Sequence, residues 1–228
     1  MVRPNNPYIL QPELQDQHWN STRYRRPESP VVEAYIRPKL DFIDSYVDFR
    51  NKRVVDVGCG NGLIASYLKK DYHAQVFGID INEWMLRHND SGLSARGDSH
   101  YLPFHDDAFE VGIEANLLHH VIDPVPVIRE MKRVSRTHVI LIEPNVYNPI
   151  MFAFSCLVKA ERGGLRSSIK NLKTWAEQAG LMVVADQTTG MISQNNTPPI
   201  LVPFLKFFDR NFCLGEYHVL VCRVMDQG

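Results

Sequence analysis

The stretch VVDVGCGNG, residues 54–62, places three glycines directly after an apolar run that contains a single acid, Asp56. Glycine adopts left-handed backbone conformations at little steric cost and lets other groups approach the main chain closely. A turn by itself rarely needs three such residues. We therefore expect Gly58, Gly60 and Gly62 to form a loop that holds a ligand against bare backbone, next to the start of a helix.

Short strands and helices alternate around this loop. Strands are predicted at 53–57, 75–80, 93–97, 109–115 and 138–143, with helices at 63–70, 82–88 and 124–134. This alternation indicates βαβ units and a mostly parallel sheet that is covered on both faces. Two further strands, at 181–187 and 216–224, bring the predicted sheet to seven.

The 228 residues suffice for one sizeable α/β domain, within which composition indicates three parts. Residues 1–50 are expected to form an N-terminal arm and helical lid, irregular as far as residue 29 and then helical, with Pro38 either kinking the helix or dividing it into two pieces. Residues 51–145 form the ligand-binding core. Residues 146–228 form the C-terminal part of the same domain, with an apolar insertion that serves as a lid or contacts substrate.

Charge and composition argue against several classes of protein. The formal net charge is -1 and no basic stripe is present, so no nucleic-acid partner is expected. The four cysteines form no C-x-x-C pair, which predicts no metal site and fits a reducing cytoplasm. No signal peptide is recognised, and the apolar run at 149–158 is about half the ~20 residues that a membrane span needs. We expect a soluble, cytoplasmic protein without a transmembrane segment.

The second strand ends in another acid, Asp80, 18 residues after Gly62. A carboxylate at this position is suited to accept hydrogen bonds from two ribose hydroxyls. Gly60-x-Gly62-x-x-Ala65 also fits the dinucleotide fingerprint, so a nicotinamide dinucleotide stays open as an alternative ligand. Asp56, however, would face that ligand, which favours an amine or a sulfonium over a pyrophosphate.

Five ordered segments, from about residue 53 to residue 143, resemble class I S-adenosylmethionine-dependent methyltransferases of the small-molecule, Methyltransferase-11-like type. They are DVGCGNG (56–62), FGIDIN (77–82), GDSHYLPF (97–104), FEVGIEANLLHHVIDP (109–124) and REMKRV (129–134). The resemblance implies S-adenosyl-L-methionine as cofactor. It also implies an α/β fold, a three-layer α/β/α Rossmann-like sandwich whose mostly parallel seven-stranded sheet has an antiparallel last strand.

The resemblance further implies which residues contact the cofactor. They are Asp56, Gly58, Cys59, Gly60 and Gly62 in the first motif, Asp80 and Ile81 in the second, Asp98 and Ser99 in the third, and Asn116 and Leu117 in the fourth. Asp56 would meet the methionine part of the cofactor, Asp80 the ribose hydroxyls, and Asp98 the adenine amino group.

Methyl transfer from a sulfonium requires mainly binding and orientation, but a protonated nucleophile can need a base. His119 and His120 lie just past the fourth strand and are the catalytic candidates, because imidazole titrates near neutral pH. The alternative for either one is a structural histidine. Glu143 and Asn145 follow the fifth strand and are candidates for substrate binding, or for turn formation next to Pro144.

The apolar segments 146–158 and 198–208 lie outside the predicted sheet. These segments could form a pocket for a lipid-like acceptor. Alternatively, they could form a lid packed on the core or a contact in a homodimer. We therefore expect a methyltransferase that acts on a small or lipid-like molecule by O-, N- or C-methylation. Two alternatives stay open: an NAD(P)-dependent oxidoreductase, and a non-catalytic interaction module that keeps the fold.

Overall fold

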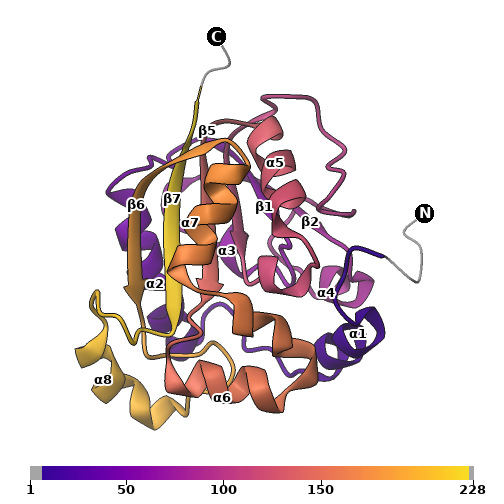
Figure 1. Ribbon diagram of the computed structural model, residues 1–228. Helices are drawn as coiled ribbons and strands as arrows, with labels where there is room; N and C mark the ends of the chain where they lie inside the picture. The colour runs from indigo at the N-terminus through magenta and orange to yellow at the C-terminus, as the bar shows by residue number, and fades with distance from the viewer. Residues whose placement is uncertain (1–6, 226–228) are drawn as a thin grey trace.

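A seven-stranded sheet runs through the molecule in the order β3-β2-β1-β4-β5-β7-β6 (Figure 1). The computed structural model describes residues 7–225, apart from the side chain of Phe208. The strands are β1 (Arg53–Val57), β2 (Gln75–Asp80), β3 (Ser94–Arg96), β4 (Phe109–Ala115), β5 (Ser135–Pro144), β6 (Leu181–Thr189) and β7 (Tyr217–Val224). β7 is antiparallel to both of its neighbours, and the other neighbouring pairs are parallel. The predicted sheet is confirmed.

Helices cover both faces of this sheet, which makes the sandwich three-layered. The α-helices are α1 (Pro12–Ser21), α2 (Pro30–Asp44), α3 (Leu63–Tyr72), α4 (Glu83–Arg87), α5 (Pro124–Val134), α6 (Pro149–Leu157), α7 (Ile169–Gln178) and α8 (Val202–Leu205). Short 3-10 helices are η1 (Leu118–His120), η2 (Lys159–Arg166), η3 (Pro199–Leu201) and η4 (Lys206–Phe208). Figure 1 shows α1, α6 and α8 beyond the end of the sheet toward which the parallel strands run.

Alternating side chains of β1 pack into two hydrophobic cores, one on each face of the sheet. Val54 packs into the core beneath α2 and α3, whereas Val55 and Val57 pack into the core beneath α5 and α7. Successive side chains of a strand point to opposite faces, so one short apolar run serves both cores. The glycine loop that follows β1 is thereby anchored from both sides of the sheet.

The N-terminal segment differs from the prediction, because the irregular arm contains helix α1. Its sequence is polar on all sides and gives no helical periodicity. The helix is held instead by Gln15, which is 1% exposed and donates from Nε2 to the His120 carbonyl at 3.1 Å. The Leu10 N–H donates to the same carbonyl at 2.9 Å. Of the predicted arm and C-terminal part, residues 1–6 and 226–228 lie outside the described residues.

The predicted division of the helix into two pieces at Pro38 is also absent, since α2 runs continuously from Pro30 to Asp44. A proline inside a helix costs about 3 kcal/mol. Ile36, Leu40 and Ile43 are each 0% exposed on the face that packs against the sheet. Burying each of them contributes roughly 1.5–3 kcal/mol, which outweighs the cost of the proline.

Candidate active site

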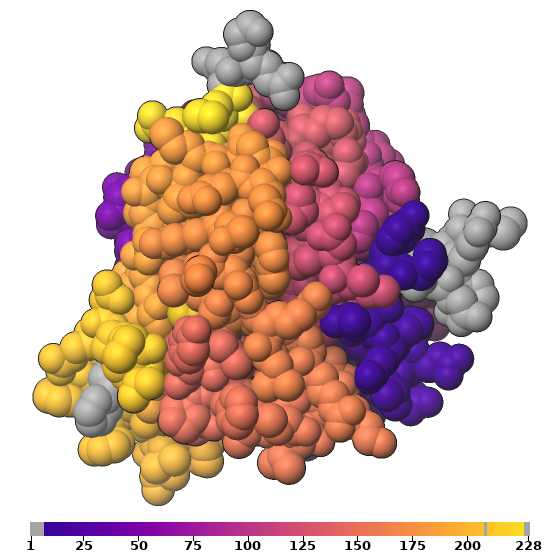
Figure 2. All heavy atoms as spheres, in the orientation of Figure 1, coloured from indigo at the N-terminus to yellow at the C-terminus, as the bar shows by residue number. Residues whose placement is uncertain are grey.

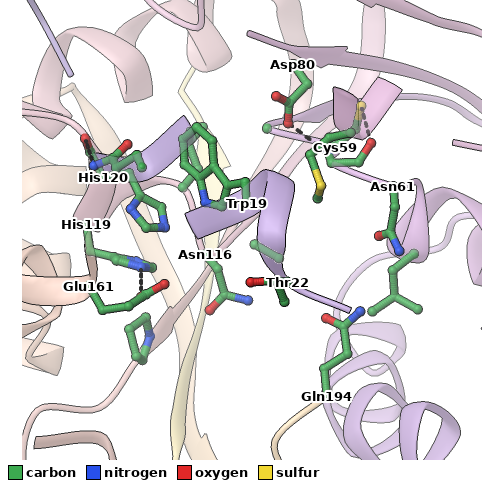
Figure 3. Close-up of a pocket in the computed structure, with 18 of the residues that line it drawn as sticks. Trp19, Thr22, Cys59, Asn61, Asp80, Asn116, His119, His120, Glu161 and Gln194 are labelled. Atoms are coloured by element: carbon green, nitrogen blue, oxygen red, sulfur yellow. Dashed lines mark hydrogen bonds and ion pairs between the residues drawn. The ribbon is translucent and has the colours of Figure 1, made fainter. Parts of the chain in front are cut away.

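A cavity of about 360 Å³ lies beyond the carboxyl ends of β1, β2 and β4. Figure 3 shows Asp80, Cys59 and Asn61 on one side of it and His119, His120 and Glu161 on the other, with Trp19 between them. The two sides are called the cofactor end and the acceptor end below. This position, at the first strand–helix turn of an open α/β sheet, is where such folds bind ligands.

The glycine loop forms the wall of the cofactor end. Gly58, Gly60 and Gly62 all adopt left-handed backbone conformations, with φ of 74°, 50° and 79°. A Cβ atom on Gly60 would lie 2.8 Å from Met85 Cε, and one on Gly62 would lie 2.2 Å from Asn89 Oδ1. The sequence therefore needs glycine here both for the turn and for the close approach of α4.

Asp80 closes β2 and fixes this loop. Its Oδ2 accepts a hydrogen bond from the Gly60 N–H at 2.8 Å, and its Oδ1 accepts one from the Asn82 N–H at 2.7 Å. Burial raises the pKa of Asp80, although these backbone donors act in the opposite direction. A carboxylate with both oxygens oriented in this way retains lone pairs for the hydroxyls of a ribose.

Asp56 is the feature that most clearly indicates a missing ligand. It is 1% exposed and lines the cavity, and its Oδ2 has no hydrogen-bond partner among the described residues. Burial, followed by the nearby Asp80 charge, raises its pKa to about 7. A buried, unpartnered carboxylate oxygen is costly unless a donor or cation meets it. The ammonium group of S-adenosylmethionine supplies such a partner, so the residues present fit this cofactor.

The remaining predicted cofactor residues also reach the cavity, with one exception. Its lining includes Cys59, Ile81, Asp98, Ser99, Asn116 and Leu117. Gly62 does not line it but forms the N-terminal cap of α3. Asn116 adopts φ of 59° and donates from Nδ2 to the Tyr35 hydroxyl at 3.1 Å. The structure thus assembles these side chains around one space, and their individual contacts with cofactor stay predictions.

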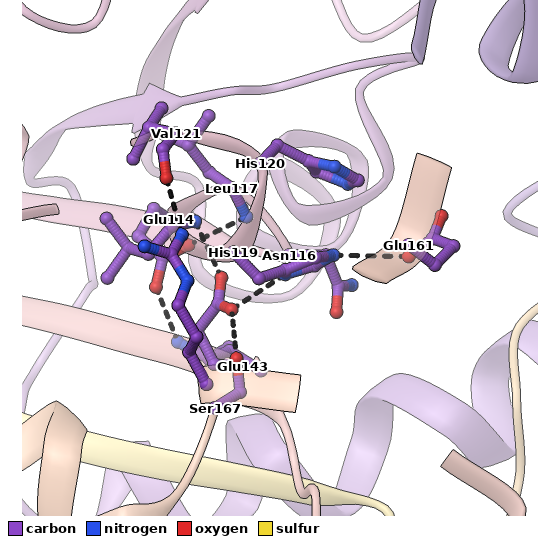
Figure 4. Close-up of polar contacts among 12 residues, drawn as sticks. Glu114, Asn116, Leu117, His119, His120, Val121, Glu143, Glu161 and Ser167 are labelled. Atoms are coloured by element: carbon purple, nitrogen blue, oxygen red, sulfur yellow. Dashed lines mark hydrogen bonds and ion pairs between the residues drawn. The ribbon is translucent and has the colours of Figure 1, made fainter. Parts of the chain in front are cut away.

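His119 lies between two carboxylates at the acceptor end (Figure 4). Its Nδ1 is 2.7 Å from Glu143 Oε2, and its Nε2 is 3.3 Å from Glu161 Oε2. Burial alone would lower the pKa of His119, but the two carboxylates outweigh it and raise that pKa to about 10. In this arrangement the ring carries a proton on each nitrogen, so it has no lone pair with which to act as a base.

His120 has the opposite environment. It is 6% exposed, and its buried Nδ1 has no hydrogen-bond partner among the residues that the structure describes. Burial and the charge of His119 lower its pKa to about 3, so its imidazole is neutral. The Trp19 ring meets it edge-on, with centroids 5.2 Å apart. Both predicted catalytic histidines therefore line the cavity, but in different charge states.

Glu143 and Asn145 do not reach the cavity, and this corrects their predicted role in substrate binding. Both are 0% exposed. Besides His119, Glu143 accepts the Leu118 N–H at 2.8 Å, while Asn145 Nδ2 donates to the Gly215 carbonyl at 2.8 Å. These side chains therefore position neighbouring segments instead of contacting a substrate.

Several lining residues come from segments without a motif. His18 and Trp19 lie on α1, Glu161 on η2, and a stretch at 193–196 covers another side. His18 Nε2 lies 3.2 Å from Glu161 Oε1, a polar contact that joins α1 to η2. Figure 2 shows the N-terminal segment packed against the segment that contains η2. Sequence reasoning missed Glu161 because it stands alone in a region without periodicity.

Apolar side chains of α6 complete the acceptor end. Ile150, Met151 and Phe154 line the cavity, and Ile150 is also 57% exposed at the surface. Phe152 and Leu157 of the same helix are 50% and 82% exposed. Among the described residues, no helix combines the length and the apolar character needed to cross a bilayer.

Comparison with known proteins agrees with this geometry. A family model described as "Methyltransferase domain" matches residues 55–142. The chain is 36% identical over 102 residues to phthiotriol/phenolphthiotriol dimycocerosates methyltransferase 1 of Mycobacterium ulcerans, a match that covers 39% of this chain and 38% of that relative. It is 36% identical over 99 residues to the fatty-acid O-methyltransferase of Mycolicibacterium smegmatis, covering 40% of this chain and 36% of the relative.

These matches span less than half the length of either curated relative. The fold is shared more widely. A crystal structure of a SAM-dependent methyltransferase from Thermotoga maritima superposes with a TM-score of 0.65 over 86% of this chain and 91% of that chain, at 16% identity. The family match, the shared fold and the acid-lined glycine loop agree: residues 55–142 are similar to a methyltransferase domain, and the chain has the fold of S-adenosylmethionine-dependent methyltransferases.

Proposed function

We propose that this chain transfers a methyl group from S-adenosylmethionine to an oxygen atom of a lipid-like acceptor. The observation that carries the proposal is a single cavity with two chemically different ends. One end has Asp56, Asp80 and the glycine loop, and the other has the apolar side chains of α6 beside a histidine pair. A cofactor and an apolar acceptor can therefore meet in the space between them.

Each part of the cofactor finds a partner of suitable chemistry in this proposal. The Asp56 carboxylate faces the ammonium group, and Asp80 accepts from the ribose hydroxyls. Ile81 and Asp98 contact the adenine. A nicotinamide dinucleotide fits less well, since its pyrophosphate would lie against the buried Asp56.

The acceptor end supports a lipid-like substrate. Met151 and Phe154 provide an apolar wall, and the exposed apolar surface of α6 continues from the cavity to the outside. The names of two relatives, a dimycocerosates methyltransferase and a fatty-acid O-methyltransferase, point to the same class of acceptor. A cytoplasmic location, the absence of a nucleic-acid partner and a homodimer stay predictions.

The chemistry requires orientation more than covalent help from protein. The acceptor oxygen attacks the methyl carbon in line with the carbon–sulfur bond, whose electron pair returns to sulfur. An acceptor hydroxyl thus becomes a methyl ether and releases one proton, whereas an ionised carboxylate becomes a methyl ester without releasing one. In both cases the cofactor becomes S-adenosylhomocysteine. His119 and His120 lie where they can contact that oxygen, and Trp19 helps to exclude water from it.

Calorimetry followed by a chain-length series tests the proposal. S-adenosylhomocysteine should bind with micromolar affinity and NADH should not bind. Labelled S-adenosylmethionine is then supplied with fatty acids or alkyl phenols of increasing chain length. Burial of each methylene contributes about 0.8 kcal/mol, so kcat/KM should rise roughly fourfold per methylene until the apolar end is full. Binding of NADH alone, or a rate that does not depend on chain length, would refute the proposal.

A further inference from the structure

We propose that His18, His119, His120 and Glu161 bind one divalent transition-metal ion, such as Zn²⁺, at the acceptor end of the cavity. All four residues line this space, although they come from three separate segments of the chain. Three imidazoles and one carboxylate are a donor set typical of zinc and of the neighbouring first-row metals.

The spacing of the donor atoms fits a single coordination sphere. Ligands about 2.0–2.2 Å from a tetrahedral zinc ion are roughly 3.3–3.5 Å apart. Glu161 has one oxygen 3.2 Å from His18 Nε2 and the other 3.3 Å from His119 Nε2. Ligand atoms of His119, His120 and Glu161 all lie within 4.8 Å of one another. His18 is close to Glu161 but lies outside that group of three, so His18 and His120 both have to move closer to complete the coordination sphere.

The second observation is the unsatisfied state of His120. Its ring is 6% exposed, and the buried Nδ1 has no hydrogen-bond partner among the described residues. A buried ring nitrogen without a partner is costly, and most buried polar side chains avoid this state. The polar contacts of Glu161 with His18 and His119 account for those three residues but leave His120 unexplained. A metal bond would satisfy all four.

The surroundings of His119 match those of a metal ligand. Histidines that bind metal almost always donate their other ring N–H to a carboxylate or carbonyl, which fixes the ring. Glu143 accepts from His119 Nδ1 at 2.7 Å, and its own oxygens are held by the Leu118 N–H at 2.8 Å and the Ser167 hydroxyl at 3.3 Å. His119 Nε2 is thereby directed toward Glu161. The charges of Glu143 and Glu161 together balance that of a divalent ion.

The role of this ion rests on the proposed function. An acceptor hydroxyl bound to the metal loses its proton to solvent more readily, and the resulting oxygen anion attacks the methyl group. The ion is neither oxidised nor reduced in this step. The metal would thus perform the activation that His119, with both nitrogens engaged, cannot perform as a base.

Metal binding can be measured without any acceptor. The purified chain is treated with a chelator, dialysed and titrated with Zn²⁺ and, as a coloured probe, with Co²⁺. We expect one equivalent of bound metal and a visible absorption band from Co²⁺. Loss of a residue that only contacts a metal ligand weakens metal binding about 10–100-fold. Glu161→Gln and His18→Ala each remove a ligand and should weaken metal binding by more than this. His105→Ala, which removes an exposed histidine outside the cluster, should still bind one equivalent.

Folding and cofactor binding are controlled in the same experiment. His18 lies on α1 and its side chain is 28% exposed, so His18→Ala should keep the fold even if a change at Glu161 does not. Both variants should still bind S-adenosylhomocysteine. Wild-type chain that binds far less than one equivalent, or variants that bind metal as tightly as wild type, would overturn the site. Methyl transfer that persists without metal would overturn its role, whereas bound metal without transfer would refute only the proposed function.

Discussion

Replacing Asp56 by asparagine should stabilise the fold while weakening the cofactor site. Burial raises the folded-state pKa of Asp56 to about 7, whereas the ordinary pKa of an aspartate is 3.8. Between pH 3.8 and pH 7, Asp56 is protonated in the folded chain and ionised in the unfolded chain. The free-energy cost of burying this group therefore grows as pH rises. At 1.36 kcal/mol per pKa unit, it amounts to about 2 kcal/mol at pH 5 and about 4 kcal/mol at pH 8. Below about pH 3.8 it vanishes.

The pH dependence of the stabilisation is the decisive readout. Buried asparagine has a desolvation cost of its own, but that cost does not change with pH. The difference in unfolding free energy between Asp56→Asn and wild type should therefore grow by about 2–3 kcal/mol from pH 5 to pH 8. For a chain of this size it corresponds to roughly 4–12 °C in Tm. Thermal unfolding followed by circular dichroism measures it, with the exposed Asp90→Asn as matched control.

Cofactor affinity should change in the opposite direction. The ammonium group of S-adenosylhomocysteine requires ionised Asp56, so wild-type affinity should fall by up to about tenfold per unit as pH drops below 7. Asp56→Asn should lose about 2 kcal/mol or more at pH 8, which is roughly 30-fold, and should show little pH dependence. A Tm difference that is constant from pH 5 to pH 8, or unchanged affinity in Asp56→Asn, would refute the assignment of this carboxylate.

Three further changes test other parts of the cavity. Asp80→Asn should weaken S-adenosylhomocysteine binding about 10–100-fold in calorimetry, because the ribose loses a charged acceptor, whereas the exposed Glu83→Gln should not. Gly62→Ala should lower unfolding free energy by about 1–3 kcal/mol in denaturant titration, because its Cβ would lie 2.2 Å from Asn89 Oδ1 at φ of 79°. Trp19→Ala should raise KM for the acceptor at least about threefold in steady-state assays, with cofactor affinity unchanged; the reverse pattern would place Trp19 at the cofactor end.

The parallel half of the fold could be predicted from sequence because local signals agree there. The runs 53–57, 75–80 and 109–115 are β1, β2 and β4 with unchanged bounds, since apolar β-branched residues, turn glycines and helix caps point to the same elements. Helix α1 could not be predicted in this way. Its stability comes from Gln15 and from contacts with a segment about 100 residues away, which no local pattern encodes.

The cofactor end of the site could be predicted for the same reason. Asp56, Asp80 and the glycines lie within a few residues of strand ends, so their positions follow from the topology of the sheet. Glu143 and Asn145 also follow a strand, yet both turn away from the cavity. Their case shows that proximity to a strand end fixes the neighbourhood of a side chain but not its direction, which depends on the loop that follows.

The division between the two ends follows the limits of the family match in part. Residues 55–142 contain the cofactor end and the histidine pair, whereas His18, Trp19, Phe154 and Glu161 lie outside that range. The acceptor end is thus built where α1 and η2 meet over the sheet, held by the pair of His18 with Glu161. An acceptor, or a metal that activates it, would therefore be recognised by the histidine pair together with side chains from outside the matched residues. Differences in acceptor among proteins with this fold can then arise without a change in the cofactor end.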